Sequence, residues 1–227
     1  MANIVPSIEK TDVYYHSNVS GTFNVLEAFN KYNVKKLVYS ASSSCYGIPD
    51  NYPTNETAEI RPQYPYALTK YLGEQLVMYW CLVYNFRRYR YVSLMYMDPV
   101  QEHQERMVQF SGVFLAQKLA SKPFTVVGDG TQTHDFTFVS DVVNANSIAA
   151  ESDIIGEIIN VGSDNTYSVN QLVELLGGDI VRIPKQPGER AALGLISARS
   201  RNCYSDILRF AWKKVFIYYC RLLIIGV

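Results

Sequence analysis

Short apolar runs alternate with stretches of helical spacing along most of the 227 residues. The apolar runs predict strands at residues 36–40, 91–97, 124–127, 135–139, 157–161 and 180–183. Apolar positions three and four residues apart predict helices at residues 11–32, 66–84, 108–120, 140–151 and 169–176. Strands that alternate with helices are typical of a parallel sheet with helices on its faces, so the pattern predicts an α/β fold.

Local features refine this picture. Residues 2–8 are expected to form a loop. Glycine costs about 1 kcal/mol inside a helix relative to alanine, so Gly21 is expected to lie where a neighbouring element packs closely. Ser168 and Gln171 form a capping box for the last predicted helix. In the helix at residues 66–84, one stripe is formed by Leu68, Leu72, Leu76, Tyr79 and Trp80.

A tyrosine and a lysine four residues apart open the helix at residues 66–84. Side chains at this spacing lie on one face of a helix, so Tyr66 and Lys70 are expected one above the other. A free phenol has a pKa of about 10, and a neighbouring ammonium favours the phenolate and lowers that pKa toward neutral pH. Such a tyrosine can act as a general base. The bare spacing is also common in amphipathic helices, where it more often marks a surface tyrosine and a solvated lysine.

A cluster of hydroxyls follows the predicted strand at residues 36–40, in the segment Ser40-Ala41-Ser42-Ser43-Ser44. A strand that ends in this cluster, then a loop, then Tyr66 and Lys70, resembles the extended short-chain dehydrogenase/reductase family. Within that family the chain is most similar to the NAD-dependent nucleotide-sugar epimerases and dehydratases, such as the UDP-galactose 4-epimerases. The later Gly128-Asp129-Gly130 turn adds to the resemblance, which runs from about Ala2 to Glu189.

The resemblance implies a catalytic set and a cofactor. Tyr66, Lys70 and Ser42 are the catalytic residues that it implies. The implied cofactor is NAD, with Asn18 and Ser40 joining these three residues as its contacts. No metal site is expected, because the three histidines lack the spacing of metal ligands.

The resemblance also implies a UDP-sugar as the substrate. Its expected contacts are Ser43, Ser44, Asp98, His134 and Gln186. Dehydratases and decarboxylases of the family carry acidic groups where this chain has Ser43 and Ser44, which favours oxidation and re-reduction at carbon 4. Asp98, His134 and Gln186 replace groups that would favour a diphosphate, so weak binding is expected, with an improvement in His134→Arg.

The implied fold is an incomplete doubly wound, Rossmann-like parallel sheet with a small α/β substrate lobe. Residues 1–97 are expected to form the C-terminal part of the NAD-binding domain. Residues 98–190 are expected to form the sugar-nucleotide lobe, with segments that return to the first domain, and residues 191–227 a divergent tail. No Gly-x-Gly-x-x-Gly turn occurs in the sequence, so the pyrophosphate half of a dinucleotide site is expected to be missing. The isolated chain is therefore expected to be poorly stable or oligomeric and to retain no NAD.

Composition excludes several classes of function. The sequence has 21 basic and 21 acidic residues, and this balance gives no indication of a nucleic-acid partner. The four cysteines are widely spaced, as in reduced cytoplasmic proteins, and no apolar stretch predicts a signal peptide or a membrane span. A homodimer is possible. Besides a 4-epimerase, two hypotheses stay open: a catalytically inactive relative that binds a partner or a sugar nucleotide, and a reductase acting on another carbonyl.

Overall fold

The centre of the molecule is a three-stranded parallel sheet in the order β1–β2–β5. The structure, a computed structural model, describes residues 4–51, 54–84, 90–96, 110–135, 139–162, 166–184 and 192–193. The strands are β1 (Lys36–Ser40), β2 (Arg90–Tyr96) and β5 (Glu157–Val161). The predicted strands at residues 36–40 and 157–161 are confirmed at both ends.

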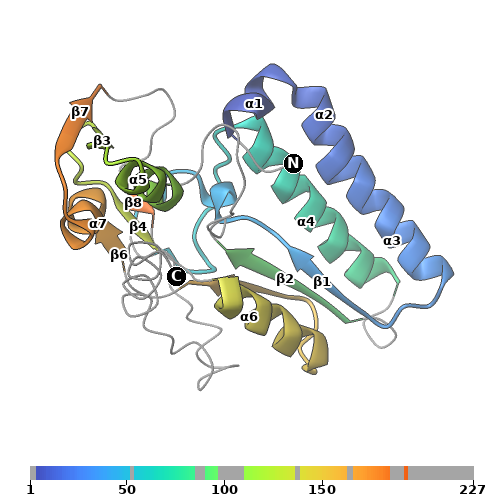
Figure 1. The fold of residues 1–227 in the computed structure, drawn as a ribbon. Helices are drawn as coiled ribbons and strands as arrows, with labels where there is room; N and C mark the ends of the chain where they lie inside the picture. The colour runs from blue at the N-terminus through green and yellow to red at the C-terminus, as the bar shows by residue number, and fades with distance from the viewer. Residues whose placement is uncertain are drawn as a thin grey trace.

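Helices cover both faces of this sheet (Figure 1). Helices α3 (Gly21–Lys31) and α4 (Pro65–Val83) cover one face, and α6 (Val139–Glu151) covers the other. Side chains alternate along a strand, so Leu37 packs on the α3–α4 side whereas Val38 packs on the α6 side. This layered arrangement confirms the predicted Rossmann-like α/β fold.

The chain reaches α3 through a nearly continuous helical segment. It consists of α1 (Ile4–Glu9), α2 (Thr11–Tyr15) and the π-helix η1 (His16–Ser20). The helix predicted at residues 11–32 is therefore confirmed, but the loop expected at residues 2–8 is wrong from Ile4 onward. Pro6 is tolerated in α1 because the first turn of a helix does not use the backbone N–H that proline lacks.

A second group of elements forms the lobe that lies beside the central sheet (Figure 1). It contains α5 (Phe110–Leu119), β3 (Phe124–Val127), β4 (Thr133–Asp135), β6 (Thr166–Ser168), α7 (Val169–Leu176), β7 (Ile180–Ile183) and β8 (Ala192–Leu193). Strand β3 pairs with β7, and β4 lies between β6 and β8. Phe114, Phe124 and Leu172 are at the centre of the lobe's apolar core.

The predicted boundaries in this lobe hold with one shift. The capping box of Ser168 and Gln171 is present, and Gly177 ends α7 with a φ of 64°. The strand predicted at residues 135–139 coincides with β4 only at Asp135, because β4 begins at Thr133. The prediction is wrong at Val139, which begins α6, and residues 136–138 lie outside the described part of the chain.

Helix α4 buries a different face from the one that its leucines predict. Leu68 and Tyr79 of the predicted stripe are 47% and 59% exposed, whereas Trp80 of the same stripe is buried. The other buried positions include Thr69, Gly73 and Val77. The helix itself, predicted at residues 66–84, is confirmed at Pro65–Val83. Within the described ranges, no helix combines the length and apolar character needed to cross a membrane.

Close packing occurs at Gly73, and the expectation for Gly21 is wrong. A methyl group on Gly21 would lie 3.5 Å from the His16 carbonyl oxygen, which is an ordinary contact. A methyl group on Gly73 would collide with the Tyr39 hydroxyl and would lie 2.8 Å from the Asn18 carbonyl oxygen. The absent side chain at Gly73 therefore lets both β1 and η1 approach α4.

Candidate active site

The Tyr66 hydroxyl donates a hydrogen bond to Ser42 Oγ at 3.2 Å. Ser42 follows the end of β1 and caps the short 3-10 helix η2 (Ser43–Tyr46), so its Oγ also accepts from the Ser44 N–H at 3.3 Å. Tyr66 and Ser42 are 2% and 1% exposed. The pair lies at the C-terminal end of a parallel strand, which is where open α/β sheets place their sites.

Lys70 lies one turn beyond Tyr66 on α4, and its ammonium returns to the same strand end. The Lys70 Nζ donates to the Ser40 carbonyl oxygen at 2.5 Å and lies 4.8 Å from the centre of the Tyr39 ring. The structure thus brings the predicted residues Tyr66, Ser42 and Lys70 together, with Ser40 contributing its carbonyl.

Asn18 contacts the same turn of α4 through Thr69. It lies in the π-helix η1, and its side-chain amide donates to Thr69 Oγ1 at 3.1 Å. The Thr69 hydroxyl in turn donates to the Tyr66 carbonyl oxygen at 3.0 Å. Single π turns are frequent at functional sites because they direct side chains that an α turn would place elsewhere. Asn18 is therefore connected, through Thr69, to the residues around Tyr66 and Lys70.

Ser7 is a contributor that sequence analysis missed. The first backbone N–H groups of a helix need outside acceptors, and Tyr64 at the N-cap of α4 supplies no side-chain bond. The Tyr66 N–H donates instead to Ser7 Oγ at 3.1 Å, and Ser7 is completely buried. The Tyr14 ring packs edge-on against Tyr66, with ring centres 6.4 Å apart. No local signal reveals this cap, because 59 residues separate its two partners.

The predicted substrate contacts are only partly described. Ser43 and Ser44 follow Ser42 in η2, the first buried and the second half-buried. His134 lies in β4, opposite Tyr167 of β6 and beside Leu193 of β8. Asp98 and Gln186 lie outside the described residues.

Comparison with protein families establishes the family of this chain. Residues 2–162 match the sequence profile of the NAD dependent epimerase/dehydratase family. The chain belongs to this family. Because the match includes Asn18, Ser42, Tyr66 and Lys70, the whole cluster described above lies in the part of the chain that is shared with the epimerase/dehydratase family.

Curated members of the epimerase/dehydratase family include several similar sequences. The UDP-glucuronate 4-epimerase of Thermodesulfobacterium geofontis is 34% identical over 208 residues, and the match covers 91% of this chain and 61% of that protein. The UDP-glucose 4-epimerase of Mycolicibacterium smegmatis is 33% identical over 172 residues, covering 75% of this chain and 54% of that protein. The chain therefore spans a little over half the length of these relatives.

Solved structures share the fold. The UDP-glucose 4-epimerase of Thermotoga maritima, with UDP-glucose, superposes with a TM-score of 0.86 at 24% identity, over 99% of this chain and 75% of that one. The Thermus thermophilus UDP-glucose 4-epimerase complex with NAD gives a TM-score of 0.85 at 21% identity, over 100% of this chain and 76% of that one.

Buried ionisable groups surround the cluster in this epimerase/dehydratase family member. Burial, and then the charge of Glu74, raise the pKa of the Cys45 thiol to about 12. Burial, followed by Glu56 and Glu74, also raises the pKa of Tyr46, whose hydroxyl donates to Asn160 Oδ1 at 2.9 Å. Glu74 is itself completely buried on α4, one turn after Lys70, although a glutamate at that position predicts a solvated side chain. Cys45 and Tyr46 are therefore neutral at physiological pH.

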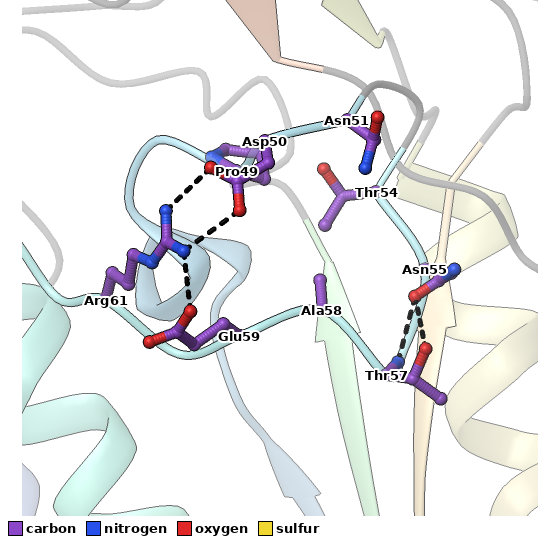
Figure 2. Close-up of a pocket in the computed structure, with 9 residues that line it drawn as sticks. All are labelled: Pro49, Asp50, Asn51, Thr54, Asn55, Thr57, Ala58, Glu59 and Arg61. Carbon is purple, nitrogen blue, oxygen red and sulfur yellow. Dashed lines mark hydrogen bonds and ion pairs between the residues drawn. The ribbon is translucent and has the colours of Figure 1, made fainter.

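Two surface cavities lie away from the Tyr66–Ser42 pair. One, of about 210 Å³, opens in the loop before α4, where the Arg61 guanidinium forks to Asp50 at 2.8 and 2.9 Å and to Glu59 at 2.6 Å (Figure 2). The hydrogen bonds and charge of Arg61 hold the pKa of Asp50 below its usual value. The other, of about 390 Å³, lies between α2 and the start of α4, beside Leu68. Neither of these two cavities is lined by Tyr66, Ser42 or Lys70.

Proposed function

We propose that this chain carries the catalytic part of an NAD-dependent nucleotide-sugar 4-epimerase. The observation that supports it is the buried Tyr66–Ser42 hydrogen bond of 3.2 Å, with Lys70 one helical turn away. The substrate class is supported by relatives named as UDP-glucuronate and UDP-glucose 4-epimerases. The cofactor is supported by the NAD dependent family to which residues 2–162 belong.

The residues of the cluster fit the reactive half of NAD. The Lys70 ammonium offers hydrogen-bond donors suited to the diol of the nicotinamide ribose, and Ser40 keeps it at the end of β1. Tyr66 and Asn18 complete the proposed contacts from the two sides of the turn that carries Thr69. The 227 residues contain no Gly-x-Gly-x-x-Gly turn, so the proposal assigns no residue to the pyrophosphate.

The proposed mechanism uses Tyr66 as the base. When held by Lys70, Ser40 and Asn18, NAD would supply a reversible hydride acceptor for carbon 4 of the sugar. The phenolate of Tyr66 takes the proton of the 4-hydroxyl as the carbon–oxygen double bond forms, and gives that proton back on reduction. The Ser42 hydroxyl hydrogen-bonds the reacting oxygen, and the positive charge of Lys70 favours the phenolate. No net oxidation of the sugar results.

Ser43 and Ser44 support epimerisation over the other reactions of the family. Loss of water or carbon dioxide from the sugar needs an additional acid or base beside the reacting carbon. Serine hydroxyls at these positions supply neither, because they do not ionise near neutral pH. The proposed substrate contacts remain Ser43, Ser44, Asp98, His134 and Gln186.

The organisation of the protein is also a proposal. Residues 1–97 would serve the cofactor, residues 98–190 the sugar nucleotide, and residues 191–227 would form a separate tail. Outward-facing apolar side chains on α3 and α4, among them Phe23, Tyr79 and Leu82, support a homodimer through these helices. Buried, free Cys45 and Cys81 support a cytoplasmic location.

The test joins the chain to a glycine-rich strand–turn–helix segment, the element that holds a dinucleotide pyrophosphate in sheets of this kind. The fusion should bind NAD and convert a UDP-sugar into its 4-epimer, whereas the 227-residue chain alone should retain no NAD. Tyr66→Phe in the fusion should lose activity by about 10²–10⁴-fold, since a general base is removed. Tyr64→Phe, two residues earlier, should leave the rate unchanged.

The products distinguish the alternatives. A fusion that binds NAD and reduces a different carbonyl would favour another reductase. A fusion that binds UDP-sugar but produces no 4-epimer, with Tyr66 intact, would favour an inactive binding relative.

A further inference from the structure

Tyr39 lies beneath α4, one residue before the end of β1. The alternation of the strand turns Leu37 and Tyr39 toward the core formed by α3 and α4, and turns Val38 toward α6. Tyr39 is half-buried there, on the same side of the sheet as Lys70. Tyr39 therefore approaches Lys70, the lysine expected to contact the cofactor, from the β1 side of α4.

The Tyr39 side chain contacts Lys70 at both its ammonium and its backbone carbonyl. The ring centre lies 4.8 Å from Lys70 Nζ, within the range in which an aromatic face attracts an ammonium. The Tyr39 hydroxyl donates to the Lys70 carbonyl oxygen at 3.3 Å. One side chain thus meets both the charge of the lysine and the backbone that carries it.

Ser40 holds the same ammonium from a second direction. Its carbonyl oxygen accepts from Lys70 Nζ at 2.5 Å, and it directly follows Tyr39 in β1. A lysine side chain has a flexible stem of four carbons, and rotation about its bonds gives many accessible rotamers. The Tyr39 ring and the Ser40 carbonyl, on adjacent residues of β1, restrict the direction of the Lys70 side chain. A group that must contact one particular ligand atom needs such a fixed direction.

Gly73 makes this arrangement possible. A methyl group at residue 73 would collide with the Tyr39 hydroxyl, and would also press on the Asn18 carbonyl at 2.8 Å. A larger side chain at residue 73 would therefore move Tyr39 away from Lys70. The glycine in the middle of α4 thus has a specific role beside the site.

We infer that Tyr39 is a positioning residue for Lys70, with its ring setting the place of the ammonium. The inference rests on the proposed function, because it concerns how Lys70 is presented to the ribose of a nicotinamide cofactor. In the proposed role, Tyr39 acts through Lys70 alone and contacts neither the cofactor nor the substrate.

The first test is NMR spectroscopy of the 227-residue chain with carbon-13-labelled lysine, with Lys70 assigned from the Lys70→Arg spectrum. Protons above an aromatic ring resonate upfield, so the ε-methylene protons of Lys70 should lie upfield of those of exposed lysines. Tyr39→Phe keeps the ring and should keep this displacement. Tyr39→Leu removes the ring and should lose more than half of it.

Leu37→Ala is the matched control, because Leu37 faces the same core two residues earlier. It should lower the melting temperature and leave the Lys70 displacement unchanged. A Lys70 signal among those of exposed lysines in the unaltered chain overturns the inference without any variant. An unchanged displacement in Tyr39→Leu overturns it as well.

The second test separates this inference from the proposed function. In the fusion that carries the glycine-rich segment, Tyr39→Leu should weaken NAD binding about tenfold, which corresponds to about 1.4 kcal/mol. Tyr39→Phe should bind NAD within about twofold of the unaltered fusion. A displaced Lys70 signal in a fusion that binds no NAD would refute the proposed function and leave the Tyr39–Lys70 arrangement standing. NAD binding that is equal in Tyr39→Leu and the unaltered fusion would refute the positioning role.

Discussion

The Tyr46 hydroxyl donates to Asn160 Oδ1 at 2.9 Å and so joins η2, which follows Ser42, to β5 at the far edge of the central sheet. Asn160 is completely buried, and its side-chain amide donates onward to the Thr54 carbonyl oxygen at 3.1 Å. The hydroxyl cluster is therefore held by a strand two positions across the sheet, as well as by α4.

Tyr46→Phe should destabilise the chain by about 1–3 kcal/mol, because it removes a buried donor while it keeps the ring. Urea unfolding followed by circular dichroism measures the change. Tyr32→Phe is the control, since Tyr32 is 70% exposed. Equal unfolding midpoints for the two variants would contradict the role assigned to this bond.

Two glycines in helices should respond in opposite ways to alanine. Gly73→Ala should destabilise by about 1–3 kcal/mol, because the methyl group overpacks against Tyr39 and Asn18. Gly21→Ala meets only an ordinary contact and should stabilise by up to about 1 kcal/mol through helix propensity. Thermal unfolding of both variants gives the comparison, and a loss at Gly21 as large as that at Gly73 would refute the packing argument.

Cys45 should make the native state less stable as the solution becomes alkaline. Its folded pKa of about 12 is raised from 9.0, so the folded state holds a proton that the unfolded state loses. This contribution is complete below pH 9 and is lost as pH rises toward 12, by about 1.4 kcal/mol per pH unit for one proton.

The stability advantage of the unaltered chain over Cys45→Ala should therefore shrink between pH 9 and pH 12. Val77→Ala provides the control, because it removes a buried apolar group that carries no proton. Its difference from the unaltered chain should stay constant over the same range. Parallel pH profiles for both variants would show that Cys45 does not titrate in this way.

Self-association should depend on the outward face of α4. Leu82 is 63% exposed there, and Leu82→Glu should shift sedimentation toward the monomer because it places a charge in an apolar contact. Val143→Glu on α6, where Val143 is 56% exposed, changes the charge equally on the other face of the sheet. The proposed dimer would be refuted by a monomeric unaltered chain, or by equal dissociation in the two variants.

His134→Arg should strengthen the binding of UDP-glucose about tenfold, because a permanent cation replaces a group that is only partly charged at neutral pH. Isothermal titration calorimetry on the fusion measures this change. Val143→Arg adds the same charge at a distant site and should leave the affinity unaltered. Tight binding by the unaltered fusion, with no gain in the variant, would remove His134 from the proposed phosphate contacts.

Local patterns were sufficient to predict the elements that carry the site. The apolar run at residues 36–40 and the Pro65 helix start are properties of adjacent residues, so β1 and α4 were found at nearly their true ends. The meeting of Tyr66, Lys70 and Ser42 follows from helix spacing and from the order of strand and helix, and the family resemblance supplied their expected roles.

Contacts between distant segments could not be predicted in this way. The Ser7 cap of Tyr66 joins residues 59 apart, and nothing near Ser7 distinguishes it from a surface serine. The buried face of α4 was missed because Leu68 points outward, while Gly73 and Glu74 lie inside. Hydrophobicity alone would bury Leu68 and expose Gly73 and Glu74. The packing of β1 and η1 against α4 gives the opposite burial.

The number of residues in the π-helix at His16–Ser20 affects the geometry of the candidate site. Gly21 N–H bonds to the His16 carbonyl, five residues back, so this turn holds one residue more than an α turn would. Deleting Ser17 would close this turn to α geometry, and because the wide turn already absorbs its extra residue, the segments on either side would keep nearly the same rotation about the helix axis. Ser7 and Tyr14, which meet Tyr66 from the preceding segment, would keep their directions, whereas Asn18, inside the wide turn, would not. A single in-frame codon loss here should therefore break the Asn18–Thr69 hydrogen bond while the contacts of Tyr66 persist.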